Sequence, residues 1–153
     1  MSRIPDILYQ EIIENVPICC VDIVVLHKGK VLLTLRKNEP EKGKWFYQGG
    51  RLLKNEKVED AVKRKAKEEI GIDVKVIKKI GTYEYFCKEY SSYKLATGFH
   101  AICITFLVEP IIKEALKIIL DKTLSDYRWT DHIGADFDPY LRTVLEDAKV
   151  FTK

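Results

Sequence analysis

The feature that most constrains the fold is a helix with an acid in the middle of its apolar face. A double glycine, Gly49-Gly50, ends an extended stretch, and a helix then runs to Gly71. At roughly 100° per residue, the apolar side chains of this helix form one arc that should pack on a sheet. Glu69 falls inside that arc. The members of the arc are Val58, Ala61, Val62, Ala66 and Ile70.

A carboxylate in such a position must be paired or must hold a cation, because a bare buried charge costs several kcal/mol. Lys65, one turn earlier, offers an ordinary ion pair with Glu69. That pair is worth at most about 0.5 kcal/mol in this orientation and leaves Glu68 and the double glycine unexplained. The other interpretation is a Mg²⁺ or Mn²⁺ site, because carboxylates and backbone carbonyls are the hard oxygen ligands that these ions prefer. Geometry alone leaves both interpretations open.

The same stretch resembles the Nudix hydrolase signature, G-x5-E-x7-R-E-U-x-E-E-x-G-U, in which U is a bulky aliphatic residue. The chain departs from it at Lys65, where the family has Glu, and at Ala66, where the family has a larger aliphatic residue. The resemblance implies a hydrolase of nucleoside diphosphates linked to another moiety, dependent on Mg²⁺ or Mn²⁺. The matching residues are Gly50, Glu56, Arg64, Glu68, Glu69, Gly71 and Ile72.

Length and composition indicate one soluble globular domain over residues 1–153. The net charge of +3 is mild, so no nucleic-acid partner is expected. The longest apolar run, Val16 to Leu26, contains Asp22 and is too short to span a bilayer. No signal peptide is expected, and the four cysteines lack zinc-site spacing. A cytoplasmic protein with free thiols and no membrane contact is therefore predicted.

The pattern along the chain predicts strands around one metal-bearing helix, with further helices outside. This is an α/β layered fold with a mixed sheet, and its order resembles the Nudix α/β/α sandwich. Ile111–Leu124 mixes Lys with Ile and Leu and fits either a helix or a flap. The other expected helices are Ile4–Asn15, with Ile7, Leu8 and Ile12 facing inward and Ile13 as a further candidate for that face, and Pro139–Val150. The expected strands are Ile18–Leu26, Val31–Arg36, Asp73–Ile80, Thr82–Lys88, Ala96 or Thr97 to Val108, and Tyr127–Thr130.

Three further stretches are similar to the GDP-mannose mannosyl hydrolase branch of the family. They are Pro17 to Asp22, Arg36 to Phe46, and Asp126 to Trp129, and the similarity covers about Ile4 to Trp129. Lys65 also fits, because this branch lacks the first acid of the helix. The resemblance implies a nucleoside diphosphate sugar as substrate, displacement at the sugar carbon with release of GDP, and a homodimer.

Carried over to this chain, the resemblance implies that the Gly49 carbonyl and Glu69 hold Mg²⁺ on the diphosphate. Glu68, an acid that the mannosyl hydrolases can lack, is a further candidate metal ligand, as in the ordinary pyrophosphatases of the family. Metal ions and guanidinium groups stabilise charge on a departing phosphate. Arg51, Glu56, Arg64 and Glu68 are the candidate catalytic residues. Arg36 and Arg51 would bind the diphosphate, Asp22 would lie at the nucleotide site, and Tyr9 would stack on the guanine.

Each of these residues also has an ordinary structural interpretation. Arg36 and Arg51 could be solvated surface charges, and Asp22 could be an acid paired with a lysine or arginine. Tyr9 could be an aromatic side chain at the edge of the core. Glu56 is expected to orient the loop or to pair with an arginine of the helix rather than to bind metal directly.

The chain departs from this branch where a general base is expected. The branch has a Gln-His pair at the positions of Thr123 and Leu124. Leucine cannot accept a proton, and losing a general base typically costs about 10²–10⁴-fold in rate. The alternative candidates for the base are Asp126, His100 and His132. His100 also replaces an expected tyrosine, and Gln48 replaces the proline that commonly precedes the double glycine.

Three hypotheses follow from the sequence. The first is a Mg²⁺-dependent hydrolase of a nucleoside diphosphate sugar that attacks the sugar carbon with an unidentified base. The second is a Nudix pyrophosphatase that cleaves a P–O bond, with both Glu68 and Glu69 on the metal. The third is a nucleotide binder that has lost catalysis. The missing histidine weakens the first hypothesis, and the retained Glu68 favours the second.

Overall fold

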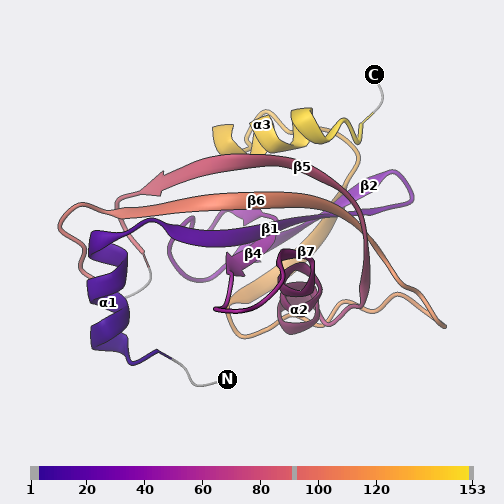
Figure 1. The fold of residues 1–153 in the computed structure, drawn as a ribbon. Helices are drawn as coiled ribbons and strands as arrows, with labels where there is room; N and C mark the ends of the chain where they lie inside the picture. The colour runs from indigo at the N-terminus through magenta and orange to yellow at the C-terminus, as the bar shows by residue number, and fades with distance from the viewer. Residues whose placement is uncertain (1–3, 91–92, 152–153) are drawn as a thin grey trace.

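A seven-stranded mixed sheet carries the fold in the computed structural model, which describes residues 4–90 and 93–151 (Figure 1). None of the helices in these ranges is long and apolar enough to cross a membrane. The elements in chain order are α1 (Asp6–Asn15), β1 (Ile18–His27), β2 (Lys30–Arg36), β3 (Trp45–Phe46), β4 (Gln48–Arg51), α2 (Val58–Ile70), β5 (Val74–Cys87), β6 (Phe99–Pro110), β7 (Leu124–Thr130) and α3 (Pro139–Ala148).

The centre of the sheet is β1, which pairs in parallel with β6 along residues 18–25. The strand order is β3-β2-β1-β6-β5, and β4 and β7 pair with β1 and β2 respectively. Strands that are covered on both faces read as nearly continuous apolar runs. The sequence of β1, ICCVDIVVLH, is such a run, and its single acid is Asp22.

Helices α2 and α3 pack on the two faces of the sheet, as Figure 1 shows. The apolar arc of α2 packs with side chains of β1 such as Val21 and Ile23. On the other face, Leu141 and Val144 of α3 pack against Val24 of β1. The predicted α/β sandwich is therefore confirmed, and it places the acidic side of α2 beside β1 and β4.

Expectations about three of the strands are wrong in detail. The edge strand β5 runs unbroken through Gly81, because β6 pairs with both of its halves and the irregularity is absorbed as register shifts between Val76 and Lys78 and between Lys79 and Gly81. The partner strand β6 begins at Phe99, later than expected, and reaches Pro110. β7 begins at Leu124, three residues before the predicted Tyr127.

The inward face predicted for the first helix is also partly wrong. Ile7 and Leu8 are 79% and 49% exposed, whereas Ile13 is 4% exposed. The helix contacts the body of the protein through its C-terminal half, where Ile12 and Ile13 pack with Ala101 of β6. In the N-terminal half, Tyr9 packs against the same cluster, whereas Ile7 and Leu8 remain exposed.

The segment between β6 and β7 is an irregular strap, which resolves the choice between a helix and a flap. Its backbone lies along the end of α2: Ile119 N–H donates to the Ile70 carbonyl and Asp121 N–H to the Glu69 carbonyl, each at 3.0 Å. These bonds satisfy carbonyls that the last turn of a helix leaves without partners. Leu116, Ile118 and Leu120 pack against the core cluster beneath α2 and fasten the strap there.

A substitution at Gly71 tests how tightly this strap is fastened. Gly71 ends α2 with φ +72°, and a Cβ there would lie 2.8 Å from the Cβ of Ile119. We expect Gly71→Ala to lower the free energy of unfolding by about 2–4 kcal/mol, combining left-handed backbone strain with the clash. Gly29→Ala is the matched control, because Gly29 has φ +73° with no atom within 4 Å of its Cβ position. Equal losses for the two variants in urea unfolding would contradict the close packing of the strap on α2.

Candidate functional site

Some of the predicted site residues share a cavity of about 140 Å³ beside β1, β4 and β6, whereas Tyr9, Glu56, Arg64, Glu68 and Glu69 do not line it. Asp22, Arg36 and Arg51 line this cavity together with the double glycine. The other residues that line the cavity were not predicted from the sequence, and they are largely aromatic and come from separated parts of the chain. They include Phe46, Tyr47, Tyr85, Tyr90, Phe99 and Tyr140, with the thiols of Cys20 and Cys103.

Asp22 lies directly against the double glycine. It is opposite Gly49 in the antiparallel register of β1 and β4, and it is only 9% exposed. A Cβ on residue 49 would collide with Asp22 Oδ1 and would lie 2.8 Å from the Val21 carbonyl oxygen, so no larger residue fits there. Burial raises the pKa of Asp22 to about 7; Cys103 and Tyr47 oppose this shift.

Glu69 lies at the end of α2, which packs on the face of β1 that carries Val21 and Ile23, and 8% of its surface is exposed. Asp22 alternates with these two residues along β1 and lines the cavity on the other face. Lys65 Nζ is 2.6 Å from Glu69 Oε1, so the ion pair considered from the sequence is present. Burial raises the pKa of Glu69, and the ammonium of Lys65 opposes that shift. The pair accounts for one carboxylate oxygen and leaves the second, Oε2, for another ligand.

Arg64 connects the loop that follows the double glycine to α2. Its Nε and Nη2 donate to the two oxygens of Glu56 at 2.6 and 2.9 Å, and Nη2 also donates to the Arg51 carbonyl at 3.1 Å. Glu56 further accepts a hydrogen bond from Leu53 N–H at 3.0 Å. Hydrogen bonding to Arg64 lowers the pKa of Glu56. Glu56 therefore positions the loop. Arg64 also donates a hydrogen bond from Nη1 to Glu68 Oε2 at 3.1 Å.

The two arginines expected at the diphosphate reach the cavity from different strands. Arg36, at the end of β2, donates from Nε to the Pro40 carbonyl at 2.6 Å. Arg51, at the end of β4, places its guanidinium 4.8 Å from the centre of the Tyr9 ring. Tyr9 lines a neighbouring cavity rather than the one that contains Asp22. The ring of Tyr9, which was expected to stack on guanine, therefore lies next to the guanidinium of Arg51.

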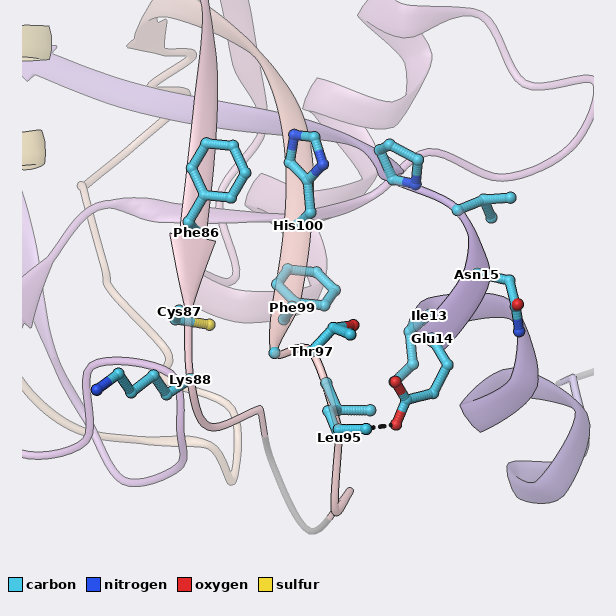
Figure 2. Close-up of a pocket in the computed structure, with 14 residues that line it drawn as sticks. Ile13, Glu14, Asn15, Phe86, Cys87, Lys88, Leu95, Thr97, Phe99 and His100 are labelled. Atoms are coloured by element: carbon cyan, nitrogen blue, oxygen red, sulfur yellow. Dashed lines mark hydrogen bonds between the residues drawn. The ribbon is translucent and has the colours of Figure 1, made fainter.

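None of the three candidate bases lines the cavity that contains Asp22. His100 lines a separate cavity of about 940 Å³ between α1 and the ends of β5 and β6, and Figure 2 shows its ring beside that of Phe86. Asp126 is exposed on β7, and His132 pairs with Asp131 on the surface. Leu124, at the position expected to hold a histidine, is 4% exposed in the core.

The described residues contain no group of three or more His, Cys, Asp or Glu side chains that could hold a metal ion by themselves. The available ligands are the second oxygen of Glu69, the half-exposed Glu68 and backbone carbonyls of the double glycine. Mg²⁺ is commonly held by one or two carboxylates together with water and substrate phosphates. The donor set therefore fits an ion that is shared with a phosphate-bearing substrate.

Comparison with known proteins places the chain in a family. The NUDIX domain model matches residues 19–150. The chain belongs to the NUDIX domain family. Its fold is similar to that of a MutT NUDIX hydrolase from Burkholderia pseudomallei, with a TM-score of 0.72 and 22% identity over 88% of this chain and 100% of that one. A NUDIX hydrolase from Nitrosomonas europaea has a TM-score of 0.67 and 20% identity over 87% and 88%.

Two curated relatives of this NUDIX chain match part of it. The low-salt glycan biosynthesis protein Agl8 of Haloferax volcanii is 48% identical over 85 residues, which are 56% of this chain and 54% of that protein. An ADP-ribose pyrophosphatase of Methanocaldococcus jannaschii is 37% identical over 95 residues, or 62% and 52% of the two chains. The matched regions thus span about half the length of these relatives.

Glu69→Gln tests the metal interpretation of this NUDIX site. The amide keeps the shape of the side chain but removes the charge that a divalent ion requires. We expect Mn²⁺ affinity, measured by electron paramagnetic resonance of the free ion, to fall by more than about tenfold, or 1.4 kcal/mol. Glu59→Gln, at an exposed position in the first turn of α2, is the control. Unchanged affinity in Glu69→Gln would remove Glu69 from the metal site.

Asp22→Asn tests the electrostatics of the cavity in metal-free protein. Because the pKa of Asp22 is raised from 3.8 to about 7, the folded state retains a proton that the unfolded state releases. The stability that this retained proton contributes to the folded state is complete below pH 4 and is lost as the pH rises towards 7. Between pH 4 and 7, the free energy of unfolding of the wild-type protein should therefore fall by about 2–4 kcal/mol relative to that of Asp22→Asn. Parallel pH profiles of the wild type and Asp22→Asn in chemical unfolding would contradict this expectation. Asp126→Asn, a variant at an exposed position, is the control and should follow the wild type.

Proposed function

We propose that the chain is a Mg²⁺-dependent hydrolase of nucleoside diphosphate sugars, with a GDP-mannose-like substrate and attack at the sugar carbon. The observation that carries this proposal is that Arg36 and Arg51 line one cavity with Asp22 and the double glycine, while Gly50 also lies against Lys65, the ion-pair partner of Glu69 on α2. A diphosphate needs concentrated positive charge, and a metal ion shared with it needs the carboxylates.

The arginines account for recognition of the leaving group. A guanidinium presents two parallel N–H donors, which match two phosphate oxygens and remain charged at any physiological pH. When bound, Mg²⁺ supplies further neutralisation of the charge that develops on the diphosphate oxygen. Arg64 has a positioning role, because its hydrogen bonds to the Arg51 carbonyl and to Glu56 hold in place the loop that carries Arg51.

The aromatic walls support a substrate with flat or apolar faces. Tyr85, Tyr90 and Tyr140 line the cavity, and Tyr90 stacks on Phe99 with ring centroids 3.8 Å apart. Such rings pack on nucleobases and on the C–H faces of sugars. The name of Agl8 places that relative in glycan biosynthesis, and the archaeal pyrophosphatase acts on ADP-ribose; both names favour a sugar-bearing nucleotide.

Asp22 is the carboxylate that we propose as proton acceptor for the attacking water. It lines the cavity, whereas His100, Asp126 and His132 do not. Its pKa of about 7 suits a general base that works near neutral pH. This assignment takes the place of the histidine that the resemblance led us to expect at residue 124.

Two expectations from the sequence remain predictions. A homodimer would cover Ile7 and Leu8 of α1, which are the exposed apolar residues of that helix. A cytoplasmic location would suit free thiols, and Cys19, Cys20, Cys87 and Cys103 are all unpaired.

A second candidate function is cleavage of a P–O bond in the same class of substrate. The side chain of Glu68 is 50% exposed, and Arg64 and Lys65 hold it at 3.1 and 3.5 Å. Its position beside Glu69 would let both carboxylates reach one metal ion, the arrangement expected for an ordinary pyrophosphatase of the family. The relative that hydrolyses ADP-ribose supports this alternative.

Turnover of GDP-mannose with Mg²⁺ in ¹⁸O-labelled water distinguishes these functions. We expect the label in mannose, because attack at the sugar carbon leaves GDP unlabelled. Label in GMP or in mannose phosphate would show P–O cleavage and would establish the second candidate. Absence of turnover for GDP-mannose and for a panel of other nucleotide sugars would contradict both and would favour a nucleotide binder.

A further inference from the structure

We propose that Lys65 is a tethered cation that takes the place of one divalent ion at the acidic end of α2, so that this site binds a single divalent ion. The inference rests on the metal dependence proposed above and concerns the number of ions and the residue that determines it. It starts from a residue that departs from the family signature and that the proposed reaction does not otherwise use.

The ammonium of Lys65 lies among the groups that would surround a metal. Nζ is 2.6 Å from Glu69 Oε1 and 3.5 Å from Glu68 Oε2. A Cβ on Gly50 would lie 2.8 Å from Lys65 Cε and 3.2 Å from Nζ, so the lysine passes directly over the double glycine. The side chain of Lys65 is only 16% exposed. The lysine is therefore part of the site rather than a solvated charge beside it.

The other charges around this position explain why a cation is required there. Besides Lys65, the charges that act on Glu69 are those of Asp121 and Arg36. Glu69 is only 8% exposed, and a buried carboxylate without a partner is costly. Lys65 supplies a positive charge at 2.6 Å, so the metal-free protein keeps Glu69 paired.

The same contacts leave room for one ion and disfavour a second. Among the described residues, no hydrogen bond or ion pair is made by Glu69 Oε2, which is free to bind a metal while Oε1 stays on Lys65. A second divalent ion bound through Oε1 would occupy the position of the ammonium, and like charges at that distance repel strongly. An acid at residue 65 would instead add a ligand and remove the repulsion.

Lys67 provides a matched control on the same helix. It is two residues away and pairs with Asp73 on the outer face at 3.1 Å, where its side chain is 58% exposed. Lys67→Met and Lys65→Met remove the same charge from the same helix, one on the surface and one at the site. Any general effect of charge on metal binding should appear in both variants.

The experiment counts Mn²⁺ bound per chain in the full-length protein without substrate, by electron paramagnetic resonance of the free ion. We expect one ion for the wild type and for Lys67→Met, and two for Lys65→Glu. Lys65→Met should keep one ion and bind it about tenfold more tightly, because no ammonium competes for the carboxylate. Its melting temperature should fall in metal-free buffer and return to that of the wild type at saturating Mn²⁺.

Two results would overturn the inference while leaving the proposed function intact. One is a wild-type protein that already binds two ions. The other is one ion of unchanged affinity in both Lys65 variants, shown to be folded by circular dichroism. A wild-type protein that binds no Mn²⁺, together with turnover that is insensitive to chelators, would instead overturn the metal dependence itself.

Discussion

The burial of the Glu69 carboxylate is the constraint on which the arrangement at the C-terminal end of α2 depends. Glu69 lies on the face of α2 that packs against the sheet, so its charge must be met within the protein. Lys65 meets it at 2.6 Å, and the strap that follows β6 covers the same end of the helix by bonding the Glu69 and Ile70 carbonyls. The helix, the lysine and the strap therefore hold a carboxylate in place for a cation.

The sheet supplies the other half of the site. Parallel pairing of β1 with β6 buries most of β1, so Asp22 is an acid in an otherwise apolar strand. Antiparallel pairing of β1 with β4 then brings the double glycine against Asp22, where the absence of side chains allows the close approach. Arg64 fixes the loop that follows through Glu56 and the Arg51 carbonyl. Asp22 and Arg51 thus line one cavity, and Arg64 holds the backbone of Arg51 from α2.

Local patterns predicted much of this arrangement. The arc of α2, the glycine that ends the helix and the pairing of Glu56 with Arg64 depend on residues close in sequence, and the structure contains them. The unbroken β5 could not be predicted, because Gly81 interrupts the local pattern and only pairing with β6 carries the strand across it. The exposure of Ile7 follows from where α1 ends its contact with the sheet, which periodicity does not describe.

The cavity walls show the same limit. Tyr85, Tyr90 and Tyr140 come from an edge strand, a loop and the start of α3, and no spacing in the sequence links them. His100 had been a candidate base because of its chemistry, but its place on β6 directs it to a different cavity (Figure 2). Residue types therefore gave the candidates for the site, whereas the sheet register determined which of them share the cavity.

The most direct test of the account is a crystal structure with Mn²⁺ and a nucleoside diphosphate sugar, with the ion located by its anomalous scattering. The account predicts one ion bonded to Glu69 and to a diphosphate oxygen, beside the double glycine, with Arg36 and Arg51 on the phosphates. An ion bound away from Glu69, or a diphosphate outside the cavity that contains Asp22, would contradict it.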